Sequence, residues 1–436
     1  MHKLLSKAKK LMKTGFFHIF GSSVINKIIA FMSSVVLVRI LTKSEYGVFT
    51  YAWNIYSIIL IFNGMGIESG VLQVSSEHSG DKYFGDKISN YGISFGMVFD
   101  LVLACVIVII GLFAPLKIEG AKEILCLLCL LPMFQLLFQM TTTYLRTQKR
   151  NQEFARLTVL NTALIFTISA GSAFILREEG LVLGYYLAYL SSFVVGLIFC
   201  RVKIFNKSGP IDHNEQQRLM KIAIISMVNN GLSQMMYLLD VFVLGVVDPQ
   251  ESLLASYKVA TMIPTALTFI PLALITYLYP YFAEHRGDGK WCLTRYKQVI
   301  VGLGSLNFLI SSVLFIGAPL IIRLLFGTQY LDAVPAFRVL SVSYFFSGTF
   351  RILSGNLLVT QMKLKFNFLV AIVSSLTNII ADYFFIQWWG SIGAAVATFL
   401  VVIVSSVLSN TYLIYTFRYD SKKIRQDSIN EKVYRH

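Results

Sequence analysis

The sequence carries too little charge for a soluble protein. Only 14% of its 436 residues are Asp, Glu, Lys or Arg, and 56% are hydrophobic. Soluble domains contain about 25% charged residues, and a soluble chain this apolar would expose large patches that aggregate. The composition therefore excludes an ordinary soluble domain and predicts an all-α polytopic membrane protein.

The chain also lacks the motifs of membrane enzymes and ATP-driven pumps. It has no D-x-D pair, no H-E-x-x-H and no G-x-x-x-x-G-K-[ST] loop, and its Gly287–Lys290 stretch has the wrong spacing for a nucleotide loop. The six histidines are scattered, and the loops on the side without the termini are too short for catalytic motifs. We expect no enzyme, no catalytic residue, no metal site and no cofactor, although a H⁺ or Na⁺ gradient is a candidate energy source.

Cysteine usage gives no disulfide or metal framework. Of the five cysteines, Cys126 and Cys129 form a C-x-x-C pattern, but they lie inside an apolar segment with leucines between them. Such a segment has no room for a hydrated metal site, so these cysteines are interpreted as small apolar helix residues.

Twelve apolar stretches have the length of membrane-spanning helices. They cover residues 15–38, 46–72, 89–113, 121–145, 154–176, 181–200, 219–246, 252–282, 298–326, 331–360, 366–386 and 390–416. The eighth contains Pro264, Pro271 and Pro280, which remove backbone donors and predict a bent or locally opened helix.

The distribution of basic residues predicts the orientation. The net charge of +15 comes mostly from lysines and arginines in the terminal segments and in alternate loops. Because loops rich in Lys and Arg stay in the cytoplasm, both termini are predicted to be cytoplasmic. The positive charge is thus interpreted as a topology signal, and nucleic acid is not an expected partner.

An internal repeat predicts two similar halves. Three pairs of segments resemble each other at nearly one spacing: Val48–Asn54 with Leu254–Ala260, Arg146–Phe154 with Val359–Phe368, and Glu179–Leu190 with Trp389–Leu400. We expect an N-terminal six-helix lobe (1–205), a cytoplasmic linker (206–218), a C-terminal six-helix lobe (219–416) and a basic cytoplasmic tail (417–436). Parallel repeats of this kind place a substrate site between the halves and suggest alternating access.

Polar residues inside apolar helices are the candidate site residues. A charge at the centre of a membrane helix costs about 2.5–3.5 kcal/mol on insertion scales, so it usually faces a cavity or a partner. The predicted basic cavity, which would bind a diphosphate and a glycan, comprises Lys27, Lys258, Arg351, Asn230 and Ser347. The alternative for the Ser, Thr and Asn side chains is helix–helix hydrogen bonding.

Four acidic residues are candidates for ion coupling or for counter-ions. Asp100 lies deep in its span, whereas Asp240 and Asp382 lie near span ends, where capping or snorkelling is an equal alternative. Glu68 is near the end of the second span.

The segments Leu37–Gln73, Tyr237–Gly245, Ala255–Ala260, Leu325–Phe350 and Asn378–Leu400 carry a family resemblance. The first contains an L-x-x-x-E-Y-G turn before a helix with a G-x-x-x-G-like end. Together they resemble the Wzx-type polysaccharide or oligosaccharide flippases of the multidrug/oligosaccharidyl-lipid/polysaccharide (MOP) exporter superfamily. The resemblance covers nearly the whole chain.

This resemblance implies a flippase in the bacterial cytoplasmic membrane. Its substrate would be a polyprenyl-diphosphate-linked oligosaccharide, moved from the inner to the outer leaflet for O-antigen, capsule or exopolysaccharide synthesis. Membrane lipid, glycosyltransferases and a polysaccharide polymerase are the implied partners. Lysine and arginine in a low-dielectric cavity suit a diphosphate.

Two other functions fit the same fold. The first is a cation- or proton-coupled multidrug exporter, which would need an acidic cavity. Asp100 is a candidate for such a cavity, so this function stays an alternative. A scaffold or spore-envelope protein without transport is the second, and it would tolerate replacement of the cavity lysines and arginines.

Overall fold

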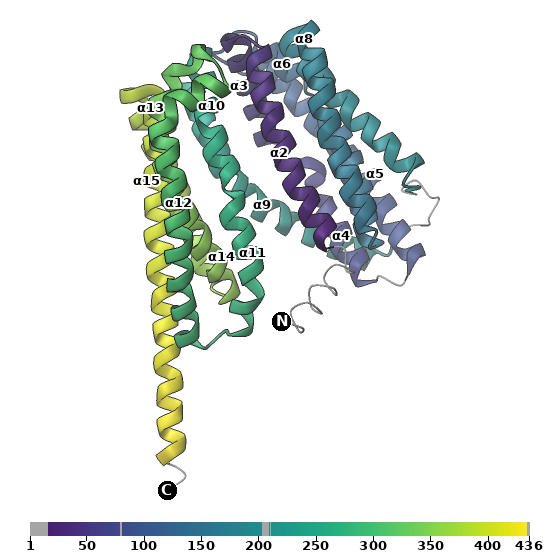
Figure 1. Ribbon diagram of the computed structural model, residues 1–436. Helices are drawn as coiled ribbons and strands as arrows, with labels where there is room; N and C mark the ends of the chain where they lie inside the picture. Colours follow the sequence, from purple (N-terminus) through teal and green to yellow (C-terminus); the bar gives the residue numbers. More distant parts are fainter. Residues whose placement is uncertain (1–15, 79–80, 203–208, 210, 434–436) are drawn as a thin grey trace. The chain divides into compact units, whose positions relative to one another are not determined.

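The computed structural model describes residues 16–78, 81–202, 209 and 211–433, and the secondary structure in this part of the chain is helical (Figure 1). The basic N-terminal lysines, part of the expected linker and the end of the tail lie outside the described residues. The helices are α2 (Phe16–Ile40), α3 (Lys43–Leu60), η1 (Asn63–Gly66), α4 (Ile67–Glu77), α5 (Lys82–Phe113), α6 (Ala121–Leu127), α7 (Leu131–Thr147), α8 (Asn151–Ile198), α9 (His213–Val247), α10 (Glu251–Leu267), α11 (Phe269–Glu284), α12 (Gly289–Leu325), η2 (Thr328–Ala333), α13 (Val334–Phe346), η3 (Ser347–Arg351), α14 (Ile352–Thr360) and α15 (Leu364–Val433).

The chain forms two compact units, Met1–Leu238 and Leu239–His436. The division falls inside α9, so most of that helix belongs to the first unit and its last turns belong to the second. The lobe boundaries expected from the repeat remain a prediction.

Each unit has its own apolar core. The core of the first unit includes the fully buried residues Ile67, Val71, Leu136, Met140 and Leu219. The core of the second includes Ile275, Phe282, Tyr296, Leu357 and Phe417. Each unit therefore buries helix faces of its own, as an independently packed bundle does.

Two of the longest helices are hairpins rather than straight rods. Arg177 in α8 and Gly390 in α15 both have φ of 54°, with ψ of −134° and −127°, and the helical path breaks there. Across the first break, Ser172 Oγ donates a 2.6 Å hydrogen bond to Gly180 O. Each hairpin therefore supplies two helical arms that lie side by side.

Matching helix ends and hairpin turns support the internal repeat. Gln148 and Gln361, which the sequence comparison aligns, both end a helix and are followed by left-handed residues, Lys149 (φ 57°) and Met362 (φ 58°). Arg177 and Gly390 stand at the same separation along the chain as this pair. The same backbone conformations thus recur at matching points of the sequence.

The outer faces of the helices suit a lipid environment. On α12, Val301, Phe308 and Ile316 expose 68%, 64% and 77% of their surface. Among the described residues, seven helical stretches are long and apolar enough to cross a membrane, or eight when the bent α6–α7 pair counts as one. Two of these stretches are hairpins with two helical arms each, so this number is not the number of membrane crossings. The expected twelve spans and the cytoplasmic termini stay predictions.

The proline-rich eighth span is interrupted as the sequence predicts. α10 ends at Leu267 and α11 begins at Phe269, so the break at Thr268 lies between Pro264 and Pro271. Proline cannot donate the backbone hydrogen bond that would continue the helix smoothly.

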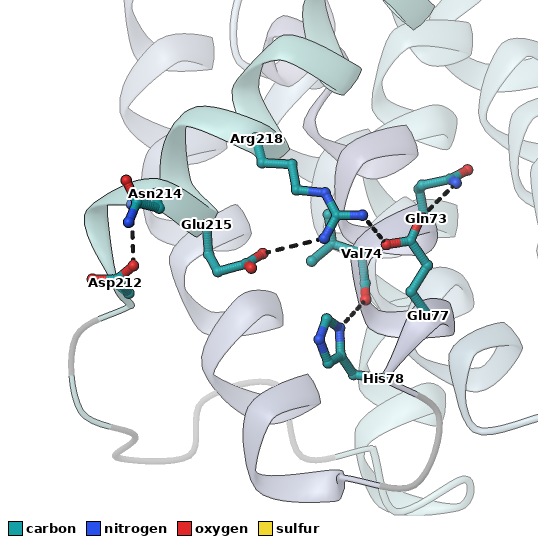
Figure 2. A network of polar contacts seen from close by, with 8 residues as sticks. All are labelled: Gln73, Val74, Glu77, His78, Asp212, Asn214, Glu215 and Arg218. Atoms are coloured by element: carbon teal, nitrogen blue, oxygen red, sulfur yellow. Dashed lines mark hydrogen bonds and ion pairs between the residues drawn. The ribbon is translucent and has the colours of Figure 1, made fainter.

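A polar network joins the end of α4 to the start of α9 within the first unit (Figure 2). Arg218 of α9 forms an ion pair with Glu77 of α4 and a second, at 3.9 Å, with Glu215. Gln73 Nε2 donates to Glu77 Oε1 at 2.9 Å. These contacts attach the beginning of α9 to α4.

Candidate functional site

The buried carboxylate of Asp240 accepts hydrogen bonds from three segments of the second unit. Asp240, near the end of α9, is 8% exposed. Its Oδ1 accepts from Asn378 Nδ2 at 2.8 Å, and its Oδ2 accepts from Tyr257 Oη at 2.8 Å and from Thr398 Oγ1 at 2.6 Å. Asp240 therefore ties α9 to α10 and to both arms of the α15 hairpin.

A second carboxyl group lies against the first. Asp382 is completely buried, and neither of its oxygens has a hydrogen-bond partner in the described structure. It interacts electrostatically with Asp240. Asn378 Oδ1 is buried without a partner as well. Buried polar atoms are almost always satisfied, so the unpartnered oxygens of Asp382 and Asn378 make this position a candidate ligand site.

The hairpin of α15 creates this arrangement. Asn378 and Asp382 are four residues apart on the first arm, so they share one helix face. The turn at Gly390 needs φ of 54°, which glycine adopts without strain. It brings Thr398 of the second arm to the same carboxylate that Asn378 reaches, and we call these residues, with Tyr257, the Asp240–Asp382 cluster.

The cluster has the chemistry of a small-cation or proton site. Two like charges in a low-dielectric interior repel strongly unless a positive charge compensates them. Three donors already occupy Asp240, so the oxygens left for a cation or a proton are those of Asp382 and the Oδ1 of Asn378, and oxygens are the ligands that hard cations prefer. Within the described residues, no group of three or more His, Cys, Asp or Glu side chains is placed to hold a metal ion, so the cluster is limited to two carboxylates with neutral groups around them.

The surroundings of Asp240 and Asp382 bear on the two interpretations of the sequence. Capping or snorkelling near a span end requires exposure to water. Both side chains are buried, and Asp240 is hydrogen-bonded within the second unit. Their role in ion coupling stays a prediction. Sequence reasoning missed Asn378, Thr398 and Tyr257, although the four-residue spacing of Asn378 and Asp382 on an apolar helix was a usable signal.

The predicted residues of the basic cavity are divided between the two units. In the first unit, Lys27 is exposed on α2, and Asn230 is exposed on α9. In the second unit, Lys258 on α10 is half-buried, and Ser347 and Arg351 are half-buried at the two ends of η3. Their assignment to a substrate cavity stays a prediction.

The π-helical turn η3 is a feature that the sequence does not reveal. It interrupts the α13–α14 span at Ser347–Arg351, and single π turns in α-helices occur frequently at functional sites. A π turn contains more residues than an α turn, so it shifts the helix register at Ser347–Arg351.

The remaining two acidic candidates lie in the first unit. Glu68 is half-buried on α4, accepts from Thr143 Oγ1 at 3.1 Å and lies 4.0 Å from Arg146 Nη1. Asp100 is completely buried on α5 and accepts from Gly64 N at 2.6 Å. Glu68 is therefore a paired carboxylate, whereas the donors to Asp100 within the described residues are amides.

Comparison with known proteins decides the family. The profile of a family described as "Polysaccharide biosynthesis protein" matches residues 36–335, which is more than half of the chain. The chain belongs to this family. No curated protein matches the chain in a separate comparison.

Solved structures show which fold the chain has. An inward-facing multidrug resistance MATE family transporter of the MOP superfamily matches with a TM-score of 0.74 at 12% identity, over 90% of this chain and 96% of that one. The lipid II flippase MurJ in an inward closed conformation matches with a TM-score of 0.68 at 17% identity, over 92% and 89%. A MOP superfamily transporter from Pyrococcus furiosus matches with a TM-score of 0.64 at 12% identity, over 93% and 95%.

These findings confirm the expected family and fold class. The protein is a multi-pass, all-α membrane protein with the fold of MOP superfamily transporters, and it belongs to a family of polysaccharide biosynthesis proteins.

Proposed function

We propose that this protein is a flippase for polyprenyl-diphosphate-linked oligosaccharides in the bacterial cytoplasmic membrane. It would move the repeat unit from the inner to the outer leaflet by alternating access, and it would serve O-antigen, capsule or exopolysaccharide synthesis. The family match is the observation that carries this proposal. The lipid II flippase with the same fold supports it.

The Asp240–Asp382 cluster is the proposed coupling site. A cation that enters the cluster neutralises the two facing carboxylates and can bind the three unpartnered oxygens of Asp382 and Asn378. A proton can satisfy one of these oxygens directly, whereas Na⁺ accepts several oxygen ligands at once. We therefore propose Na⁺ as the coupling ion.

The cluster connects the end of α9 with α10 and with both arms of α15. Asp240 sits on α9, which begins in the first unit and ends in the second. Its partners lie on α10 and on both arms of α15. Occupation of the cluster would stabilise the packing of α9 on these helices, and this differential stabilisation is what an ion needs to shift a conformational equilibrium.

The substrate side of the proposal rests on Lys258 and Arg351. Both are half-buried in apolar helices of the second unit. Charged side chains within such helices usually face a cavity or a partner. A diphosphate suits these side chains, since attraction strengthens as water is excluded.

The direct test is deletion of the gene in its native bacterium, followed by complementation. We expect loss of surface polysaccharide, with the lipid-linked precursor trapped in the inner leaflet. Wild-type protein should restore export, and Asp382→Asn should not. Normal precursor distribution in the deletion strain, together with increased drug sensitivity, would instead identify a multidrug exporter.

A further inference from the structure

The helix that runs through α3 and α4 is broken by three consecutive left-handed residues. Gly64, Met65 and Gly66 have φ of 50°, 53° and 73°. Glycine adopts this conformation without strain, whereas Met65 costs of order 1–3 kcal/mol unless its surroundings hold it. The break therefore needs an interaction that stabilises it.

The carboxylate of Asp100 provides that interaction. Asp100 comes from α5 and is completely buried. Its Oδ1 accepts from Gly64 N at 2.6 Å, and its Oδ2 accepts from Asn63 Nδ2 at 3.3 Å. Asn63 Nδ2 also donates to Pro132 O of α7 at 3.0 Å. The break is thus fastened to α5 and α7 through one acidic side chain.

The surroundings of Asp100 contain no compensating cation among the described residues. No lysine or arginine forms an ion pair with it, and η1 and α7 offer only amides and a carbonyl. From α3 the buried phenol of Tyr56, whose oxygen has no hydrogen-bond partner in the described structure, interacts with it electrostatically. Glu68 of α4 is engaged with Thr143 and Arg146 instead.

These neighbours favour a proton over a metal cation as the ligand of Asp100. The two N–H groups direct their hydrogens at the carboxylate and would repel a cation placed there. A proton adds to one oxygen without displacing either helix. An uncompensated buried carboxylate is unfavourable, so a proton taken from water relieves the desolvation.

The break lies directly against α9. A Cβ on Gly66 would lie 2.6 Å from Ala223 O, and one on Gly70 would lie 2.7 Å from Leu219 O. The two glycines therefore let the backbones of α4 and α9 touch, next to the Glu77 ion pair of Figure 2. A change in the geometry of the break must alter the packing of α4 on α9.

We propose that Asp100 is a proton-binding site that controls the break between α3 and α4, and through it the contact of α4 with α9. In the charged state the carboxylate holds the Gly64 N–H and Asn63 amide. When a proton converts it to a carboxylic acid, these bonds lose their charged acceptor and the left-handed turn relaxes. The inference goes beyond the proposed Na⁺ site, because it concerns a proton in the first unit, and it depends on no particular substrate.

Hydrogen exchange of the full-length protein in nanodiscs tests this directly. Exchange in peptides that cover residues 61–70 is measured from pH 5 to pH 9 and expressed as protection relative to an unstructured peptide. We expect the wild type to lose about tenfold protection in a sigmoidal transition as the pH falls. Asp100→Asn should lack the transition and stay at the low-protection level throughout.

Glu68→Gln is the matched control, since it removes a carboxylate from the same broken helix without touching the Gly64 bond. It should keep the wild-type transition. A flat wild-type profile would overturn the proposal, and so would an unchanged transition in Asp100→Asn. Loss of the transition in Glu68→Gln alone would assign the proton to Glu68 and equally overturn it.

Discussion

Replacing Asp382 by asparagine separates ion binding from folding in the second unit. Asp382 is buried beside Asp240 without a hydrogen-bond donor. The asparagine keeps the volume and removes one of the two facing charges. Without a cation, the variant should be at least as stable as the wild type, because the repulsion between the carboxylates is gone.

The expected magnitude follows from binding linkage. A ligand that binds only the folded state stabilises it by about 2.7 kcal/mol when its concentration is one hundred times its dissociation constant. For a folding unit of 150–250 residues, each kcal/mol raises the melting temperature by about 2–4 °C. Saturating Na⁺ should therefore raise the melting temperature of the wild type by roughly 5–10 °C.

The assay is thermal unfolding of the purified protein in detergent, at constant ionic strength, with Na⁺ exchanged for choline. Asp382→Asn should lose the Na⁺-dependent rise while keeping its stability in choline. Glu284→Gln, an exposed carboxylate of the same unit, should respond as the wild type does. An undiminished Na⁺ response in Asp382→Asn would refute the coupling site.

Three further changes follow from the same contacts. Tyr257→Phe removes one hydroxyl donor from Asp240, and it should lower stability in saturating Na⁺ by about 1–2 kcal/mol and weaken the Na⁺ response in the same melts. Gly66→Ala places a Cβ at φ of 73° and against a carbonyl of α9, so it should destabilise the protein by about 2 kcal/mol or more; an unchanged melting temperature would contradict that packing. Lys258→Ala and Arg351→Ala should each weaken binding of a soluble diphosphate analogue about tenfold, measured by calorimetry, while the Na⁺-dependent stabilisation remains.

Much of the fold follows from the sequence because membrane helices obey simple rules. Apolar length predicts the spans, and the proline cluster from Pro264 to Pro280 predicts the interrupted helix at Thr268. The repeat is visible in Gln148 and Gln361, and the structure gives both the same helix-ending conformation. The break at Gly64–Gly66 was not predicted, because glycines in membrane helices usually signal only close packing.

The sequence predicted the two acidic residues of the candidate site but not their partners. Asp240 and Asp382 stand out because carboxylates are rare in apolar helices. Their neutral partners do not, since Asn378, Thr398 and Tyr257 resemble ordinary packing residues until the hairpin at Gly390 brings them together. Tertiary contacts between distant segments are beyond any local pattern.

Flipping by the purified protein in proteoliposomes tests the central claim most directly. Vesicles would carry a polyprenyl-diphosphate-linked oligosaccharide, with the sugar exposed on the outer leaflet read by lectin binding during an imposed Na⁺ gradient. The account predicts gradient-dependent transfer by the wild type and only background transfer by Asp382→Asn. Equal transfer by wild type, Asp382→Asn and protein-free vesicles would contradict it.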